Sequence, residues 1–405
     1  MTEFPINIAD YDYPLTENRI AKYPLSERDQ SKLLVYKDHN IIESAFQNIS
    51  EHLPTGSLLI FNNTRVIRAR LIFQKESGTR IEIFCLQPEG SYGQTGGKVT
   101  WKCLIGNAKR WKSGNLTLIA VDGDEQVTLT ATRGEQIVDA HRVTFTWNKP
   151  GIAFEQVLEL AGKIPLPPYL NRAPELSDAE RYQTIYAQFN GSVAAPTAGL
   201  HFTPKVLESI EAKNCRFEYL TLHVGAGTFK PVSVDDARQH TMHEEELIVE
   251  KQLILKLLQN ISGNIIPVGT TSMRSLESLY WLGCRILNGY DPGQSFFIDQ
   301  WEPYQNEVKT PASEALQAIF DYLHRNNLQS VSGFTQIMIV PGYRFRICKA
   351  LITNFHQPQS TLLLLVAALI GKNWEKAYKY ALDNDFRFLS YGDSCLFFPE
   401  ETQNP

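Results

Sequence analysis

A histidine at the end of a loop of small residues is the first candidate for chemistry in this chain. The loop covers residues 191–203 and reads GSVAAPTAGLHFT, with His201 near its end. Glycine and proline let such a loop approach a ligand closely and adopt angles that larger residues avoid. Thr203 and Pro204 predict a helix start directly after it, and a helix N-terminus favours an anionic or carbonyl group. The segment is therefore either a ligand-binding loop or a well-formed turn.

A second histidine stands just before a glycine-rich turn. Residues 222–229 read LHVGAGTF, which places His223 before Gly225 and Gly227. The glycines would let backbone amides approach a ligand while the histidine acts on it. A short glycine motif is a weak signal, so on its own this segment is more often a buried histidine beside a tight turn.

A third cluster combines imidazoles and carboxylates at residues 240–246, which read HTMHEEE. On a helix His240 and His243 would share a face, and they could hold a metal with a glutamate as third ligand. The spacing does not match the H-E-x-x-H or H-x-x-E-H pattern of metallohydrolases. A polar surface helix and a substrate-contacting pair of His243 and Glu245 are the other interpretations.

Cations gather at two places that suit an RNA backbone. Lys109, Arg110 and Lys112 surround Trp111 in a short loop, which suits phosphates and a stacked base. Arg65 begins an alternating run of arginines that could extend a basic surface. Such runs are also common on ordinary solvated faces.

The fold must position these residues, and the middle of the chain, at about residues 68–147, shows the period-two hydrophobic pattern of β-strands. Short segments rich in Val, Ile, Thr and Phe alternate there with glycine-containing turns, at 68–75, 80–87, 98–106, 116–122, 126–132 and 141–147. Strands at this spacing, with no helical pattern between them, predict a compact antiparallel sheet or small barrel.

The flanking parts alternate between helices and strands, which is typical of an α/β domain with a largely parallel sheet. Helices are predicted at 152–162, 204–213, 250–260, 271–283, 311–325, 359–371 and 373–384, and strands at 58–62, 216–224, 264–270 and 335–340. Ser177 is predicted to open a further helix with a capping box. The predicted fold is a large α/β domain (1–66 and 148–405) with a mainly parallel sheet. An antiparallel β-barrel domain (67–147) is inserted into it.

Several polar loops follow strands of the predicted α/β sheet, where ligands tend to bind. Thr270 and Thr271 follow one strand and begin a helix that carries Arg274. Asn354 and His356 follow the apolar segment 350–353.

Composition excludes several classes of protein. The chain has 405 residues, and its net charge of −5 argues against a general polyanion-binding protein while allowing a local basic patch. None of the six cysteines stands in a C-x-x-C pair, so reduced thiols are expected rather than a zinc ribbon. The N-terminus lacks the features of a secretory signal, and the longest apolar run, 362–370, is too short for a membrane span. We expect a cytoplasmic protein.

Ordered motifs along nearly the whole chain match one known family. They are YDYPL at 11–15, FNNTRV at 61–66, PLPPY at 165–169, ERYQTIYA at 180–187, the two glycine-containing runs described above, VGTTS at 268–272 and LITNFH at 351–356. On these motifs the chain resembles the S-adenosylmethionine:tRNA ribosyltransferase-isomerase family of queuosine biosynthesis.

The resemblance implies a fold and a reaction. The family has a large α/β domain with an inserted β-barrel. Its reaction moves the ribosyl part of S-adenosylmethionine onto the aminomethyl group of a 7-deazaguanine base at the tRNA wobble position, giving epoxyqueuosine and releasing adenine and methionine. The implied partners are this tRNA and S-adenosylmethionine, without a metal or separate redox cofactor. We expect a monomer.

The reaction needs an acid or base and groups that bind the substrate, and the residues above supply candidates. His201 and His223 are the first acid/base candidates, followed by His243 and Glu245. The candidates for binding S-adenosylmethionine are Thr197, Gly225, Gly227, Thr228, Thr270, Thr271, Arg274, Asn354 and His356. The candidates for tRNA are Arg65, Lys109 and Arg110.

Some positions depart from the family pattern. Asn63 stands where the family usually has Asp, Gln359 replaces a usual Lys, and the segment between Tyr280 and Phe334 is longer than usual. These differences motivate a second hypothesis, a diverged relative that uses S-adenosylmethionine or a related nucleoside on another acceptor. A non-catalytic nucleotide- or RNA-binding protein and a metal-dependent hydrolase are the remaining alternatives.

Overall fold

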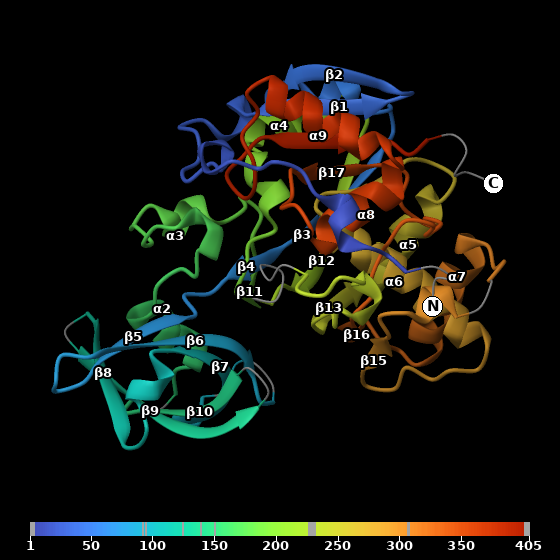
Figure 1. Ribbon diagram of the computed structural model, residues 1–405. Coiled ribbons are helices and arrows are strands. Elements are labelled where there is room, and N and C mark those ends of the chain that lie inside the picture. The colour runs from blue at the N-terminus through green and yellow to red at the C-terminus, as the bar shows by residue number, and fades with distance from the viewer. Residues whose placement is uncertain are drawn as a thin grey trace.

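The computed structural model divides visibly into a part rich in strands and a larger part of sheets and helices (Figure 1). It describes residues 5–90, 93, 95–123, 125–137, 140–149, 151–225, 232–305 and 308–400. Two stretches of chain, from β4 (Thr64–Val66) to β5 (Arg70–Gln74) and from α2 (Phe154–Ala161) to α3 (Asp178–Arg181), connect the two parts.

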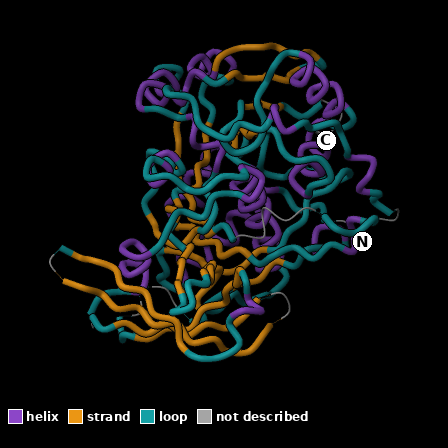
Figure 2. Tube along the Cα trace, turned by 60° about the vertical axis from the view of Figure 1, so that its left-hand side comes forward, coloured by secondary structure: helices purple, strands orange, loops and turns teal. Residues whose placement is uncertain are grey.

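The strand-rich part is a six-stranded antiparallel sheet in the order β5-β6-β7-β10-β9-β8. The remaining strands are β6 (Arg80–Pro88), β7 (Lys98–Gly106), β8 (Asn115–Asp122), β9 (Glu125–Ile137) and β10 (Ala140–Trp147). The edge strands β5 and β8 contact each other, so the sheet curls into a barrel-like shape. Figure 2 shows these strands together at the lower left. All six strands predicted from the period-two pattern are confirmed.

Alternate residues of these strands form a core of their own. Leu71, Phe73, Ile81 and Ile83 are buried in it, as expected where every second side chain faces inward. Helix α2 adds Phe154, Val157 and Leu158 to the same core and packs against β5 and β8. The barrel-like sheet is thus completed by a helix from outside it in sequence.

The central sheet of the larger part is mixed. Its order is β14-β3-β12-β13-β16-β15, from β3 (Leu58–Asn62), β12 (Arg216–His223), β13 (Glu245–Glu250), β14 (Ile265–Pro267), β15 (Phe296–Ile298) and β16 (Ser330–Thr335). Strand β12 is parallel to β3 but antiparallel to β13, and β13 is antiparallel to β16. A parallel return needs a crossover, and the described residues between β12 and β13 contain only one short 3-10 turn. The mainly parallel sheet that we predicted is therefore not confirmed.

Two smaller sheets flank the central one. One has the order β17-β18-β1-β2, from β1 (Lys32–Lys37), β2 (Asn40–Ala45), β17 (Leu351–Asn354) and β18 (Ser394–Phe397). The other pairs β11 (Phe189–Ser192) with β4 in parallel. This two-stranded sheet brings the start of the loop at 191–203 next to β4, the strand that follows Asn63.

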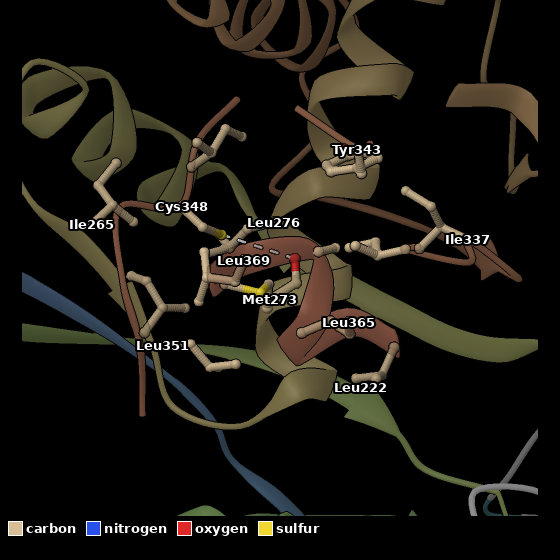
Figure 3. Close-up of a cluster of buried hydrophobic side chains, with 14 of the residues drawn as sticks. Leu222, Ile265, Met273, Leu276, Ile337, Tyr343, Cys348, Leu351, Leu365 and Leu369 are labelled. Carbon is tan, nitrogen blue, oxygen red and sulfur yellow. Dashed lines mark hydrogen bonds between the residues drawn. The ribbon is translucent and has the colours of Figure 1, made fainter. Parts of the chain in front are cut away.

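A long buried helix organises the core of the larger part. Helix α6 (Thr270–Leu287) is buried from its first residue to Cys284. Figure 3 shows Met273 and Leu276 of this helix beside Leu365 and Leu369 of α8 (Thr361–Ile370). The other helices are α1 (Ile49–His52), α4 (Pro204–Glu211), α5 (Lys251–Asn260), α7 (Ala312–Arg325) and α9 (Asn373–Asp383). Among the residues described, every helix is too short or too polar to cross a membrane.

Three local predictions are wrong. Residues 240–244 form no helix but run extended into β13, whose Leu247 and Val249 alternate inward. The predicted strand at 335–340 lies earlier, at β16. The helix after Ser177 is a single turn, and the Ser177 side chain does not cap it. In contrast, the six cysteines are unpaired and buried, as expected.

Candidate active site

A pocket opens where three polar loops of the larger part meet. Its empty volume is about 740 Å³, and its walls come from residues 194–198, from Gly269–Thr271 at the start of α6 and from residues 353–357 after β17. Tyr169, Val224, Ser360, Leu362, Leu389 and Ser390 also line it. None of the described residues that line it is Asp, Glu, Lys or Arg. The pocket therefore offers neutral polar groups and small apolar side chains.

The start of α6 is shaped by a glycine. Gly269 has a φ of 92°, a backbone angle that residues other than glycine rarely adopt. The glycine therefore allows the chain to turn here from β14 into the helix. The first residues of the helix then face the pocket. The hydroxyl Oγ1 of Thr271 is buried and has no hydrogen-bond partner within the described structure. A ligand that donates or accepts a hydrogen bond at this point would satisfy it.

Asn354, the last residue of β17, is the second wall residue with an unsatisfied atom. Its Nδ2 donates to Nε2 of His201 over 3.0 Å and lies 3.5 Å from the backbone oxygen of Asp393. Its Oδ1 is buried and has no partner in the described part of the chain. A buried acceptor without a donor costs free energy, so this oxygen is suited to a donor group on a ligand.

His201 lies behind this wall rather than in it. The ring is 4% exposed, and its Nδ1 is 2.8 Å from the hydroxyl of Ser31. Because Nε2 accepts from Asn354, the proton resides on Nδ1 and is donated to Ser31. Burial, with the nearby positive charge of Arg387, lowers the pKa of His201 to about 3. His201 is thus a neutral ring with both nitrogens occupied, and its geometry suits the positioning of Asn354.

His356 is the histidine that lines the pocket. Its Nε2 is 2.9 Å from Oγ1 of Thr353, and its backbone N–H donates to the hydroxyl of Tyr378. Burial lowers the pKa of His356 to about 3, so the ring is neutral at pH 7. Among the described residues, Nδ1 of this ring has no hydrogen-bond partner, which leaves it for a ligand.

His223 ends β12 next to the pocket without lining it. Its Nδ1 is 3.0 Å from Oγ1 of Thr64. Gly191, with a φ of 153°, makes room for the ring, since a Cβ there would stand 2.5 Å from Nδ1. Burial lowers the pKa of His223 to about 4. The following residue, Val224, reaches the pocket wall.

The remaining acid/base candidates do not line the pocket. Glu245 and Arg274 form a buried ion pair at 2.5 Å that joins β13 to α6, and Nε of Arg274 donates to the backbone oxygen of Ile337. His243 is exposed on the segment before β13. Where the chain is described, no group of three His, Cys, Asp or Glu side chains gathers to hold a metal ion.

The cations predicted for tRNA lie on the surface. Lys109 and Arg110 line a shallow hollow on the barrel-like sheet, together with Lys75 and Lys112. Trp111 between them is buried in the core of that sheet, so it cannot stack on a base as the sequence suggested. Arg65 is exposed on β4.

The structure brings five of the predicted binding residues into one pocket, namely Thr197, Thr270, Thr271, Asn354 and His356. Gly225 follows the wall residue Val224, whereas Gly227 and Thr228 lie outside the described residues. Sequence reasoning missed Tyr169, whose hydroxyl is 2.5 Å from that of Ser390. Tyr169 ends the proline-rich motif at 165–169, but nothing in that motif gave a chemical reason to propose the tyrosine as a site residue.

Comparisons with known proteins agree on one family. The family model described as queuosine biosynthesis protein matches residues 8–397. The chain belongs to this family. A relative from Magnetococcus marinus is 34% identical over 97% of this chain and 94% of its own, and one from Syntrophomonas wolfei is 37% identical over 96% of each. Both relatives bear the name S-adenosylmethionine:tRNA ribosyltransferase-isomerase.

A solved structure of an S-adenosylmethionine tRNA ribosyltransferase from Thermotoga maritima is also similar to this chain. It is 27% identical, and the match covers 96% of this chain and 99% of the other with a TM-score of 0.46.

Proposed function

We propose that this protein is an S-adenosylmethionine:tRNA ribosyltransferase-isomerase. It transfers and isomerises the ribosyl group of S-adenosylmethionine onto 7-aminomethyl-7-deazaguanine at the tRNA wobble position, and it releases adenine and methionine. The observation that carries the proposal is the identity of 34% and 37% to relatives of that name over nearly the whole chain.

The first step of such a reaction moves a proton inside a pocket whose described lining holds no charged side chain. Removing the proton beside the sulfonium gives an ylide without net charge. The neutral base that accepts the proton takes over the positive charge, so the net charge in the pocket stays the same. The small side chains at 194–198 leave room for a nucleoside between α6 and the end of β17.

We assign roles by position relative to this pocket. Asn354 and Thr271 bind the substrate through their unsatisfied oxygens, and Thr197 and Thr270 add polar wall. His356 is the acid/base group within reach of the ligand. His201 acts as a positioning residue behind Asn354, because both of its ring nitrogens are occupied.

The other parts of the proposal concern organisation and partners. We place the catalytic domain at residues 1–66 and 148–405 and the inserted domain at residues 67–147, with α2 of the catalytic domain packed onto the core of the inserted one. The partners are S-adenosylmethionine and a tRNA that carries the aminomethyl-deazaguanine base. The enzyme acts in the cytoplasm as a monomer, without a metal or separate cofactor.

The structural surroundings of Asn63 and Gln359, two positions that suggested a different acceptor, do not favour one. Oδ1 of Asn63 accepts a hydrogen bond from Oγ1 of Thr221 at 2.7 Å, and an aspartate could accept the same bond. Gln359 adopts a φ of 53° in the turn before α8 and does not line the pocket.

The test uses S-adenosylmethionine labelled in its ribosyl group together with tRNA bearing the aminomethyl-deazaguanine base. The proposal expects adenine release that matches the label gained by the tRNA. Adenine release without labelled tRNA would instead indicate another acceptor. Neither event would indicate a protein that only binds.

A further inference from the structure

A groove lies beside the pocket, between the outer face of the barrel-like sheet and the proline-rich segment 163–174. Its empty volume is about 1920 Å³. The groove and the pocket share one wall. Pro168 lines the groove and Tyr169 lines the pocket, and both belong to the same 3-10 turn, Pro168–Leu170.

The groove carries positive charge on a chain whose net charge is −5. Its lining contains four cations and one carboxylate. Arg70 pairs with Glu82 at 2.6 Å, and Arg172 pairs with Asp178 at 2.7 Å. The charges of the exposed Arg80 and Lys163 have no ion-pair partner within the described structure.

The floor of the groove is apolar. Ile72, Phe84 and Leu104 are partly buried and lie on the outer face of strands whose alternate residues fill the core. Outward-facing apolar side chains on a sheet are unusual where solvent is the only neighbour. A partly buried aromatic ring near cations is a combination that proteins use to bind single-stranded nucleic acid, by stacking on its bases and contacting its backbone.

We propose that this groove binds the strand of tRNA next to the wobble base, with its phosphates at Arg80 and Lys163 and a base stacked on Phe84. An enzyme that acts on a base must take that base out of the stack while holding the adjacent backbone. The shared wall at Pro168–Leu170 places such a strand directly beside the pocket. This inference rests on the proposed function for its substrate.

The test compares tRNA affinity in charge-reversal variants of the full chain. Arg80→Glu with Lys163→Glu is expected to raise the Kd for tRNA about tenfold at physiological salt. The slope of log affinity against log salt should fall by about one for each cation lost. Binding of S-adenosylmethionine should not change. Phe84→Ala should weaken tRNA binding about tenfold with the salt slope unchanged.

The matched control reverses two exposed lysines at α9, Lys372→Glu with Lys376→Glu. Wild-type affinity in the groove variants, or an equal loss in the control, would overturn the inference. Ribosyl transfer by the wild type is measured separately. Absence of transfer with intact, groove-dependent tRNA binding would contradict the proposed function while supporting the groove.

Discussion

At the scale of single residues, the site is built from neutral groups that hold one another in place. His201 joins Ser31 to Asn354, and Oδ1 of Asn354 has no partner among the residues that the structure describes. This arrangement changes the role expected for His201 from acid or base to support. In the proposed site, the substrate is recognised by buried oxygens such as Oδ1 of Asn354, and removing such an oxygen removes a hydrogen bond to the substrate.

Asn354→Ala tests this recognition. Loss of a buried hydrogen bond of about 1.5–3 kcal/mol is expected to lower kcat/KM for ribosyl transfer about ten- to hundredfold. The measurement is the initial rate at substrate concentrations below KM. Ser31→Ala, on the far side of His201, serves as the control and should have a smaller effect. A wild-type rate in Asn354→Ala would show that this side chain does not contact the substrate.

At the scale of elements, a buried carboxylate fixes the two walls of the pocket relative to each other. Glu277 in α6 accepts hydrogen bonds from the hydroxyl of Tyr343 and from the backbone N–H groups of Arg346, Ile347 and Cys348. The loop that donates them leads directly into β17 and Asn354. Glu277 therefore fixes the position of α6 relative to the loop that leads into β17.

Glu277→Gln places an amide group opposite donors that need an acceptor. At least one buried donor then loses its partner, and the free energy of unfolding should fall by about 3 kcal/mol. Urea unfolding measures this loss, and the exposed Glu314→Gln in α7 is the control. Equal stability of the two variants would mean that the loop finds other acceptors.

The elements also show which features the sequence can predict. Period-two patterns placed the six strands of the barrel-like sheet because each strand buries every second residue. Strand β13 was not predicted, because the polar run at 240–246 suggested a helix and only Leu247 and Val249 show the inward alternation of a strand. The hydrogen bonds that His201 makes with Ser31 and Asn354 were not predicted, because these two residues are 170 and 153 positions away from it in the sequence.

At the scale of the whole molecule, burial of neutral histidines makes the fold sensitive to acid. The folded pKa values of His201 and His356 are about 3, far below the unfolded value of about 6.5. Between these values the unfolded chain binds more protons than the folded one. Stability is therefore complete above about pH 6.5 and is lost as the pH falls from there toward 3.

His201→Gln tests this linkage. Between pH 7 and pH 5 the wild type should lose about 2 kcal/mol of unfolding free energy through His201 alone, and the variant should lose that much less. Denaturant unfolding at the two pH values gives the difference, with the exposed His39→Gln as control. The same pH dependence in wild type and His201→Gln would show that folding does not lower the pKa of His201.

The central claim is that ribosyl transfer occurs in the pocket between residues 194–198, α6 and the end of β17. Its most direct test is single-turnover transfer of ribosyl label to tRNA by the wild type and by Thr197→Trp, which fills the pocket from a half-buried position. Thr117→Trp, on the exposed face of β8, controls for the added ring. The account predicts labelled tRNA from the wild type and the control, and none from Thr197→Trp. Transfer by Thr197→Trp at the wild-type rate would contradict it.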